Sequence, residues 1–571
     1  MMFKKYKQVY AILILLVSVV FISCAKEGLP PGGPVDMTPP QVVSNFPATN
    51  STKINTDTYI EIQFSETMDK EKTDSSIFIS PVTKEPFKYK WKGKKLVIKP
   101  TKLLEKNKTY VIAVGTGASD IHENHLAKPY SFAFSTGETV DQGEISGSVF
   151  SSGEATVRIS VWAFQLDNRD NPNPAVDMPE YVTQPDNAGN YKMQYISLGK
   201  YRLYAVGDVN DNLKWDVDEE PIGVSSGDVM LTADQSSKTG CNFVISKRDT
   251  VGPSLLTCQL LDNEKLQLEL DEEPDSVSLF KLDNYKIVCE NDNSESIKVN
   301  CVYFPTNENR KPCLSIEPLK PKTNYKLTID GLTDKWANKI NNSFDSCAFS
   351  ETDKKDTISP TIIFLSVKDK ESAVPLDAKL EFRFSEPMDR QSIEESFFVK
   401  DTNGTKVNGN INWLGCAGFV FVPQDSLKNS FTYQTGFEAG KALDLFGNRM
   451  SDSLFKITFV TVNPDTLGQV SGKVKISDNS YVSAQIVIEA ISVGNAASRT
   501  YCKVLKSPGE YKFTDLLPGK YTINAFVDLN GNSKLDLGSP FPFIPSEPKT
   551  VYPDTITVRS RWETESVDLS F

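Results

Sequence analysis

The stretch FSETMD at residues 64–69 returns as FSEPMD at residues 384–389. The offset between the two copies is 320 residues (384 minus 64). A second, unrelated stretch, DVNDN at 208–212, returns as DLNGN at 528–532 with the same offset. Two unrelated stretches that share one offset indicate that a block of chain is duplicated, and such a block predicts an array of small modules.

The bulk composition favours several β domains. The chain has 571 residues, enough for about four or five domains of ordinary size. Its 33 prolines, 32 glycines and 10% aromatic residues are typical of β structure with many turns. The net charge of −12 argues against a nucleic-acid partner, because a phosphate-binding surface needs clustered Lys and Arg.

The N-terminal residues predict the compartment. A basic start is followed by an apolar run at 9–22, which is short for a membrane span and ends in FISC at 21–24. This resembles a bacterial lipoprotein signal peptide, and the resemblance implies that residues 1–23 are removed and that Cys24 carries acyl chains that bind a membrane. An ordinary signal peptide with an incidental cysteine is the alternative.

The residues after Cys24 extend this prediction. The stretch AKE at 25–27 looks like the export signal of surface lipoproteins in Bacteroidetes-type bacteria. It implies a lipid-anchored protein of the outer membrane and cell envelope, with exposure at the cell surface as one option. Glycine and proline then predict a flexible tether over residues 24–37.

Three segments share one order of landmarks. In residues 38–137 an alternating strand leads into FSETMD, and a hairpin, a Thr-Tyr strand, an Asp-to-Asn loop and a Phe-x-Phe strand follow. This order resembles the SbsA-type bacterial Ig-like domain, which implies a seven-stranded sandwich with Phe64 and Met68 in the core. Residues 356–462 repeat the order. Residues 249–352 form a divergent copy, in which an acidic stretch replaces FSExMD.

Two further segments share another pattern. Residues 143–247 contain GNYKM and LGKYRL, and residues 467–571 contain GEYKF and PGKY. Both resemble the carboxypeptidase regulatory-like, prealbumin-type β-sandwich. The fold prediction is therefore all-β, a tandem array of about five β-sandwiches, and the short linkers predict that the modules follow one another end to end.

The strongest candidate site is the Asp/Asn loop of each prealbumin-like module. Oxygen ligands at alternate positions are what Ca²⁺ needs, although Leu213 and Ser539 depart from the EF-hand spacing. An Asx-turn loop that caps its own backbone is the alternative. Calcium is the one cofactor predicted, with candidate ligands Asp208, Asn210, Asn212, Asp216, Glu219, Asp528, Asn530, Asn532 and Asp536.

No set of residues predicts catalysis. Glu66 and Asp69 are paired acids, but general acid/base work needs a cleft, and a structural role is favoured. The two histidines, His122 and His125, are three apart in a predicted loop, which does not match the zinc motif HExxH. No serine-nucleophile, phosphate-loop or dinucleotide motif occurs.

Eight cysteines follow Cys24, and five of them lie in residues 249–352. Export makes disulfides feasible, and Cys258 and Cys347 lie near the first and last strands of that segment, where a bond between them is conceivable. Connectivity is not deducible from the sequence, and buried free thiols are the favoured interpretation for most of the cysteines.

The sequence predicts a non-enzymatic cell-envelope lipoprotein that acts as a spacer and an adhesion or binding module for a protein or glycan ligand. The alternative is a carbohydrate-binding accessory lipoprotein of a glycan-uptake or secretion system. It would need exposed aromatic residues, and the candidates, each with a core role as its alternative, are Trp162, Trp215, Trp336 and Trp413. A glycosidase using carboxylates is a third hypothesis, but small sandwiches offer little cleft for two facing acids.

Overall fold

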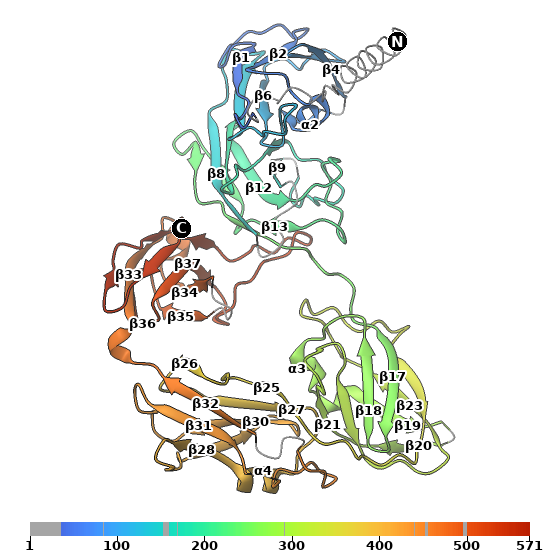
Figure 1. The fold of residues 1–571 in the computed structure, drawn as a ribbon. Coiled ribbons are helices and arrows are strands. Elements are labelled where there is room, and N and C mark those ends of the chain that lie inside the picture. The colour runs from blue at the N-terminus through green and yellow to red at the C-terminus, as the bar shows by residue number, and fades with distance from the viewer. Residues whose placement is uncertain are drawn as a thin grey trace, which may run out of the picture. The chain divides into compact units, whose positions relative to one another are not determined.

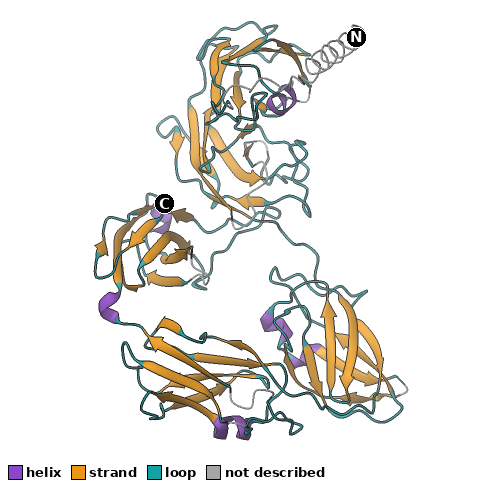
Figure 2. Ribbon diagram, viewed as in Figure 1, coloured by secondary structure: helices purple, strands orange, loops and turns teal. Residues whose placement is uncertain are grey.

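The computed structural model describes residues 36–571 apart from 84, 152–158, 168, 291, 439, 451–454 and 495–498. The signal peptide, Cys24 and nearly all of the predicted tether therefore lie outside the described residues. Strands dominate the described part, and its few helices are short (Figure 2). No described helix has both the length and the apolar character needed to cross a membrane. The prediction of an all-β array of sandwiches is confirmed.

The chain divides into two compact units, and each is described by itself. The described part of one unit is 36–78 and 83–140, and the other consists of Ile79–Val82 and Asp141–Phe571. The first sandwich has sheets ordered β1-β2-β5-β4 and β3-β6-β7. Its elements are β1 (Val42–Phe46), β2 (Ile60–Phe64), α2 (Lys70–Asp74), β3 (Ile77–Ser80), β4 (Phe87–Lys92), β5 (Lys95–Pro100), β6 (Thr109–Val114) and β7 (Tyr130–Ser135).

The third and fourth sandwiches repeat this two-sheet plan. The third has sheets β17-β18-β22-β21 and β20-β19-β23-β24, and the fourth has β25-β27-β30-β29 and β26-β32-β31-β28. The elements of the third are β17 (Leu255–Asp262), β18 (Lys265–Leu270), α3 (Ser276–Leu279), η1 (Leu282–Asn284), β19 (Tyr285–Cys289), β20 (Asp292–Ile297), β21 (Val299–Tyr303), β22 (Cys313–Ile316), β23 (Asn324–Ile329) and β24 (Ser346–Ser350). Those of the fourth are β25 (Ile362–Leu365), β26 (Glu371–Val374), β27 (Leu380–Phe384), α4 (Arg390–Ser396), β28 (Phe397–Asp401), β29 (Gly409–Trp413), β30 (Gly418–Pro423), β31 (Thr432–Phe437) and β32 (Lys456–Thr461).

The second and fifth sandwiches share another topology, in which late strands pair in parallel with the first strand. The second contains β8 (Gly143–Ser151), β9 (Ser160–Gln165), β10 (Tyr181–Thr183), β11 (Asn190–Ile196), β12 (Gly199–Val206), β13 (Ile222–Val224), β14 (Val229–Leu231), β15 (Ser237–Lys238) and β16 (Phe243–Ile245). The fifth follows η2 (Pro464–Thr466) and contains β33 (Gly468–Lys475), η3 (Asn479–Tyr481), β34 (Gln485–Val493), β35 (Thr500–Leu505), β36 (Glu510–Leu516), β37 (Gly519–Asp528), β38 (Lys549–Val551), β39 (Ile556–Val558), β40 (Glu563–Thr564) and β41 (Leu569–Ser570).

The repeated stretch FSExMD is a structural element, as predicted. Alternation along β27 buries Leu380, Phe382 and Phe384, because successive side chains point to opposite faces of a strand. In the first sandwich Phe64 and Met68 are buried in the same way. The final Asp of the stretch caps a short helix, and the Asp389 carboxylate accepts the Ser392 N–H at 2.8 Å.

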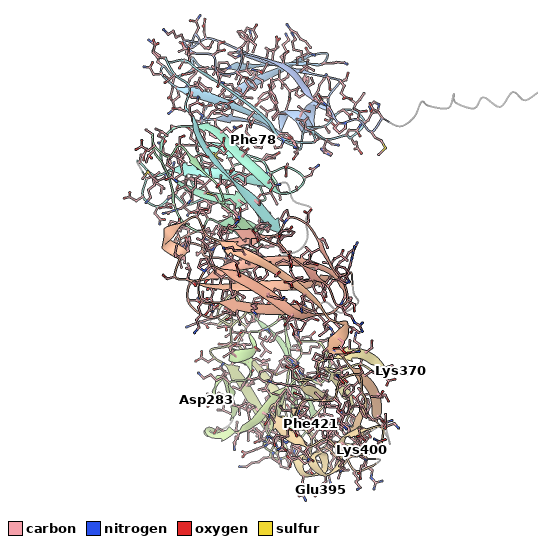
Figure 3. The ribbon with its side chains drawn as sticks, turned by 90° about the vertical axis from the view of Figure 1, so that its left-hand side faces the viewer. Phe78, Asp283, Lys370, Glu395, Lys400 and Phe421 are labelled. Carbon is pink, nitrogen blue, oxygen red and sulfur yellow. A yellow bond between two sulfur atoms is a disulfide. The ribbon has the colours of Figure 1, made fainter. Side chains whose placement is uncertain are left out.

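The side chains of the fourth sandwich lie either in its core or on its surface. Phe421 on β30 lies in the core, whereas Glu395 on α4 and Lys370 before β26 are exposed (Figure 3). The Phe382 ring lies between 5.1 and 5.6 Å from the rings of Phe397, Phe419 and Phe437, and these rings make an aromatic centre for the sandwich.

The prediction of an end-to-end arrangement is wrong within the second unit. Contacts join the fifth sandwich, which contains β37, to the second, which contains β12 (both strands are labelled in Figure 1). Tyr204 Oη donates to Pro540 O at 3.1 Å, and the Arg202 guanidinium stacks 3.8 Å from the centre of the Phe543 ring. The loop that carries Pro540 and Phe543 contacts residues that lie 336 positions earlier (540 minus 204) and 341 positions earlier (543 minus 202) in the chain, and local patterns cannot reveal such contacts.

The cysteines divide between bonds and free thiols. Cys258 on β17 is bonded to Cys347 on β24, as the sequence allowed. Cys301 is bonded to Cys416 of the fourth sandwich, a pairing that the sequence did not predict. The free cysteines of the described residues are Cys241, Cys289, Cys313 and Cys502, of which only Cys502 is exposed.

Candidate functional site

The predicted calcium loop of the second sandwich begins where β12 ends. Asp208 is buried, and its two carboxylate oxygens accept the N–H groups of Asn212 at 3.1 Å and Leu213 at 3.0 Å. Burial, followed by the nearby Glu220 carboxylate, raises the pKa of Asp208 to about 6, although the backbone donors oppose the rise. The Asp208 carboxylate is therefore buried beneath the loop and is held there by the backbone of the loop.

The other predicted ligands also bond within the loop. The amides of Asn210 and Asn212 donate to Asp216 Oδ2 at 2.7 and 3.5 Å. The side-chain oxygen of Asn210 accepts the Asn212 N–H at 3.0 Å, and that of Asn212 accepts the Lys214 N–H at 2.6 Å. This is the self-capping arrangement that the sequence offered as the alternative to calcium.

The acid that completes this loop is Glu220 and not the predicted Glu219. Glu219 is exposed, whereas Glu220 is almost fully buried. Glu220 accepts the Val209 N–H at 2.7 Å and the Asp216 N–H at 3.0 Å. EF-hand spacing pointed to Glu219, but the recurrence of Glu-Pro after both loops was the signal that could have identified Glu220.

The fifth sandwich repeats the arrangement. Asp528 accepts the Gly531 and Ser533 N–H groups at 2.7 and 2.8 Å, and Gln485 Nε2 at 2.8 Å. Burial opposes ionisation, but these donors outweigh it and hold the pKa of Asp528 below its usual value. Glu547 occupies the place of Glu220, because it accepts the Leu529 and Asp536 N–H groups.

The remaining loop ligands follow the same scheme. The Asn530 and Asn532 amides donate to Asp536 Oδ2 at 2.6 and 3.2 Å. In both loops hydrogen bonds join the predicted metal ligands to one another or to the loop backbone, apart from Glu219. The atoms that these side chains offer to a metal are all oxygens, which suits a hard cation. The buried carboxylates have further lone pairs, so the residues present fit Ca²⁺.

A second recurring feature lies in the loop before the last strand of the first, third and fourth sandwiches. A loop Asp in each copy accepts the N–H of residues two and four positions later and the side-chain amide of an Asn. Asp334 accepts Trp336 N, Asn338 N and Asn338 Nδ2, each at 2.8 Å. The other two copies are Asp120 and Asp444.

Each loop Asp belongs to a cluster of ligand atoms that lie within 4.8 Å of one another. The clusters are Asp36, Asp120 and His122 in the first sandwich; Asp249, Glu272 and Asp334 in the third; and Asp356, Glu386 and Asp444 in the fourth. His122, for which the sequence gave no metal role, thus approaches two carboxylates, with its Nδ1 3.8 Å from Asp36 Oδ2.

The clusters of the third and fourth sandwiches differ in whether a lysine lies beside their carboxylates. The Lys265 ammonium, from the third sandwich, contacts Asp356 and Glu386 of the fourth and lies 3.8 Å from Asp262. Burial raises the pKa of Glu386 to about 7 despite this lysine. Burial and the adjoining Asp249 also raise the pKa of Glu272 to about 7.

The joint between the third and fourth sandwiches also contains a partly open, largely apolar pocket of about 780 Å³. The Cys301–Cys416 disulfide lines it, together with Phe280, Leu282 and Leu414. Its volume falls in the range of small-molecule pockets.

The tryptophans proposed for glycan stacking do not form one exposed face. Trp162 and Trp215 are buried. Trp336 and Trp413 are partly buried, and arginine guanidinium groups lie 5.3 and 5.2 Å from their ring centres. The most exposed tryptophan among the described residues is Trp562, which was not a candidate.

Comparison with known proteins identifies two of the segments. Residues 36–136 and 356–461 match the family model of the bacterial Ig-like domain, and they are bacterial Ig-like domains. No curated protein matches the chain.

Several solved structures are similar to parts of the chain at low identity and low TM-score. The N-terminal part of the bacterial S-layer protein SbsC is 12% identical, with 37% of this chain and 44% of that chain covered and a TM-score of 0.17. Domains 1–6 of SbsC are 11% identical, with 87% and 66% covered and a TM-score of 0.16. An L,D-transpeptidase, LdtMt1, in complex with imipenem is 11% identical, with 25% and 73% covered and a TM-score of 0.15.

Proposed function

We propose that the protein is a non-enzymatic, lipid-anchored spacer and binding module of the cell envelope. The observation that carries the proposal is the use made of the polar side chains. The final Asp of each FSExMD stretch caps a short helix, and Asp208 and Asp528 of the Asp/Asn loops accept N–H groups of their own loops. Tandem sandwiches of this kind give a spacer its length and offer surface to which a partner can bind.

The joint between the third and fourth sandwiches supports the spacer role. A disulfide and a buried lysine–carboxylate cluster both join them. Two such links make bending at this joint costly. The adjoining cavity supports a binding role, since its walls are largely apolar and its volume suits a small ligand or a side chain.

The anchor is tested by metabolic labelling with a fatty acid in cells that make the wild type or Cys24→Ala. We expect label and membrane retention only in the wild type. Protease treatment of intact cells then tests surface exposure, and cell adhesion to envelope or glycan surfaces tests binding. Equal labelling of the two proteins would contradict the lipid anchor, and equal adhesion by cells lacking the protein would contradict the adhesive role.

We also propose that the loops at Asp208 and Asp528 bind Ca²⁺ and are stiffened by it. Their gathered oxygen donors support this. The test is thermal unfolding with calcium and with a chelator, in the wild type and in Asp208→Ala/Asp528→Ala. A melting temperature that rises with calcium only in the wild type supports the proposal, and equal responses contradict it.

Carbohydrate binding remains the second candidate function. Its support is the exposed Trp562 in the fifth sandwich, because sugars stack on exposed aromatic faces. A glycan array with wild type and Trp562→Ala distinguishes it from a pure spacer: binding lost in the variant supports it, and no binding by the wild type rules it out.

A further inference from the structure

We propose that the pocket at the joint between the third and fourth sandwiches binds a free long-chain fatty acid, with the hydrocarbon tail against its apolar walls and the carboxylate on the guanidinium of Arg390. The proposal rests on the binding role stated above and deepens it, because it names the class of ligand for the same pocket. Two observations carry it: the exposed apolar side chains that line the pocket, and one arginine that is held there without an acidic partner.

Both sandwiches contribute apolar side chains to the pocket. The third supplies Phe280 and Leu282, which follow the short helix α3, and Phe304, which follows β21. The fourth supplies Leu414, from the loop between β29 and β30. The Phe280 and Phe304 rings meet edge to face with their centres 6.0 Å apart, and they therefore form one aromatic corner of the pocket.

Three of these side chains remain open to solvent. The exposed fraction is 48% for Phe280, 37% for Leu282 and 46% for Leu414. Exposed apolar groups that gather around a pocket mark a binding site, because an apolar ligand that covers them removes their surface from water. The pocket volume of about 780 Å³ lies in the range of small-molecule sites, so the ligand that covers these groups can be a small molecule.

The cationic group of the pocket is Arg390, the first residue of α4. Its guanidinium stacks 5.2 Å from the centre of the Trp413 ring and donates to Gly415 O at 3.2 Å. Glu394 accepts Trp413 Nε1 at 2.9 Å and so holds the ring on which the arginine stacks. An arginine has five N–H donors, and most of those of Arg390 are left for a ligand.

The charges around the pocket favour an anion. Among the described residues, no carboxylate forms an ion pair with Arg390, whereas Arg383, the other arginine of the lining, donates to Glu381 at 2.6 Å. Glu273 is the one acid among the described lining residues, and it accepts Asn309 Nδ2 at 3.5 Å. A carboxylate head can take two parallel N–H donors from the unpaired guanidinium.

A hydrocarbon tail fits these walls better than a peptide does. A peptide would bring N–H and C=O groups into the pocket, and each of them needs a hydrogen-bond partner when it is buried. The apolar side chains of the walls do not supply such partners, whereas a hydrocarbon tail needs none. A fatty acid carries its single charge at one end, which matches apolar walls beside one unpaired guanidinium.

The test measures the binding of cis-parinaric acid, a fatty acid that fluoresces in apolar surroundings. The protein is the purified full chain with Cys24→Ala, so that no acyl group at residue 24 can occupy the pocket. We expect saturable binding that palmitate reverses. Hexadecanol, which has the same tail without the carboxylate, should displace the probe at least tenfold less well. No saturable binding, or equal displacement by palmitate and hexadecanol, overturns the proposal.

Two matched pairs of variants locate the site. Arg390→Gln should weaken palmitate binding at least tenfold, whereas Arg449→Gln, at an exposed arginine of the same sandwich outside the pocket lining, should leave it unchanged. Leu414→Glu places a negative charge on the apolar wall and should abolish binding. Leu445→Glu, at an exposed leucine of the same sandwich outside the lining, should not. Equal affinities within either pair, in variants whose circular dichroism matches the wild type, overturn the proposal.

Other ligands are outcomes of the same comparison. If vesicles of dioleoylphosphatidylglycerol, or an apolar peptide with a free C-terminus, bind through Leu414 while palmitate does not, the fatty-acid proposal is overturned. The lipid anchor and adhesion are measured in cells and do not depend on palmitate, so they can succeed where this test fails. Palmitate binding by a chain whose cells show no adhesion contradicts the adhesive role alone.

Discussion

Cys301 on β21 of the third sandwich is bonded to Cys416 of the fourth, with their Cα atoms 6.2 Å apart. The bond closes a loop of 115 residues and ties two sandwiches that have separate cores. The Lys265 ammonium adds a buried ionic link across the same junction, because it contacts Asp356 and Glu386 of the fourth sandwich.

Removal of this bond should destabilise the pair. Cys416→Ser is expected to lower the free energy of unfolding by about 2–4 kcal/mol, because the unfolded chain regains the entropy of a long loop. Urea unfolding under oxidising conditions measures the loss. Cys502→Ser, at an exposed free cysteine, is the control and should change little. Equal midpoints for the two variants would contradict the prediction.

The aromatic centre of the fourth sandwich should be sensitive to truncation. Phe382→Ala is expected to cost about 3–5 kcal/mol, because it removes a fully buried ring among three others. Phe364→Ala, at a partly exposed ring of the same sheet, should cost much less. Thermal unfolding of both variants gives the comparison, and a smaller loss at Phe382 than at Phe364 would contradict the described core.

Glu220 and Glu219 provide an adjacent matched pair. Glu220→Ala leaves two backbone N–H groups of the loop without their acceptor and should cost about 2 kcal/mol. Glu219→Ala should be nearly neutral, because Glu219 is exposed. Hydrogen exchange at Val209 and Asp216 should rise only in the Glu220 variant. If both variants behave alike, the position of Glu220 beneath the loop is wrong.

The buried cluster around Glu386 should make stability depend on pH. Its pKa of about 7 exceeds the usual 4.5, so the folded chain retains a proton there that the unfolded chain has lost. The free energy of unfolding should therefore fall as pH rises from about 4.5 to 7. Urea unfolding of wild type and Glu386→Gln at pH 5 and pH 7.5 isolates this contribution, which should be absent from the variant. A wild type whose stability rises relative to the variant over this range would contradict it.

Sequence patterns predicted the parts of this protein that depend on near neighbours. Alternation placed Phe64 and Phe384 in cores, and the shared offset of two motifs revealed the duplicated modules. The final Asp of the FSExMD stretch was predicted to be structural, and it caps a helix in each copy, because a cap needs only residues within one turn.

Contacts between distant segments were decided only by the tertiary structure. The Cys301–Cys416 bond, the packing of Phe543 on Arg202 and the insertion of Lys265 between Asp356 and Glu386 each join residues about 90 to 340 positions apart. Strand period and turn chemistry act over a few residues and carry no information about which module faces which. The same limit explains why the EF-hand spacing pointed to Glu219, whereas in the structure the buried Glu220 accepts a backbone N–H group of the loop.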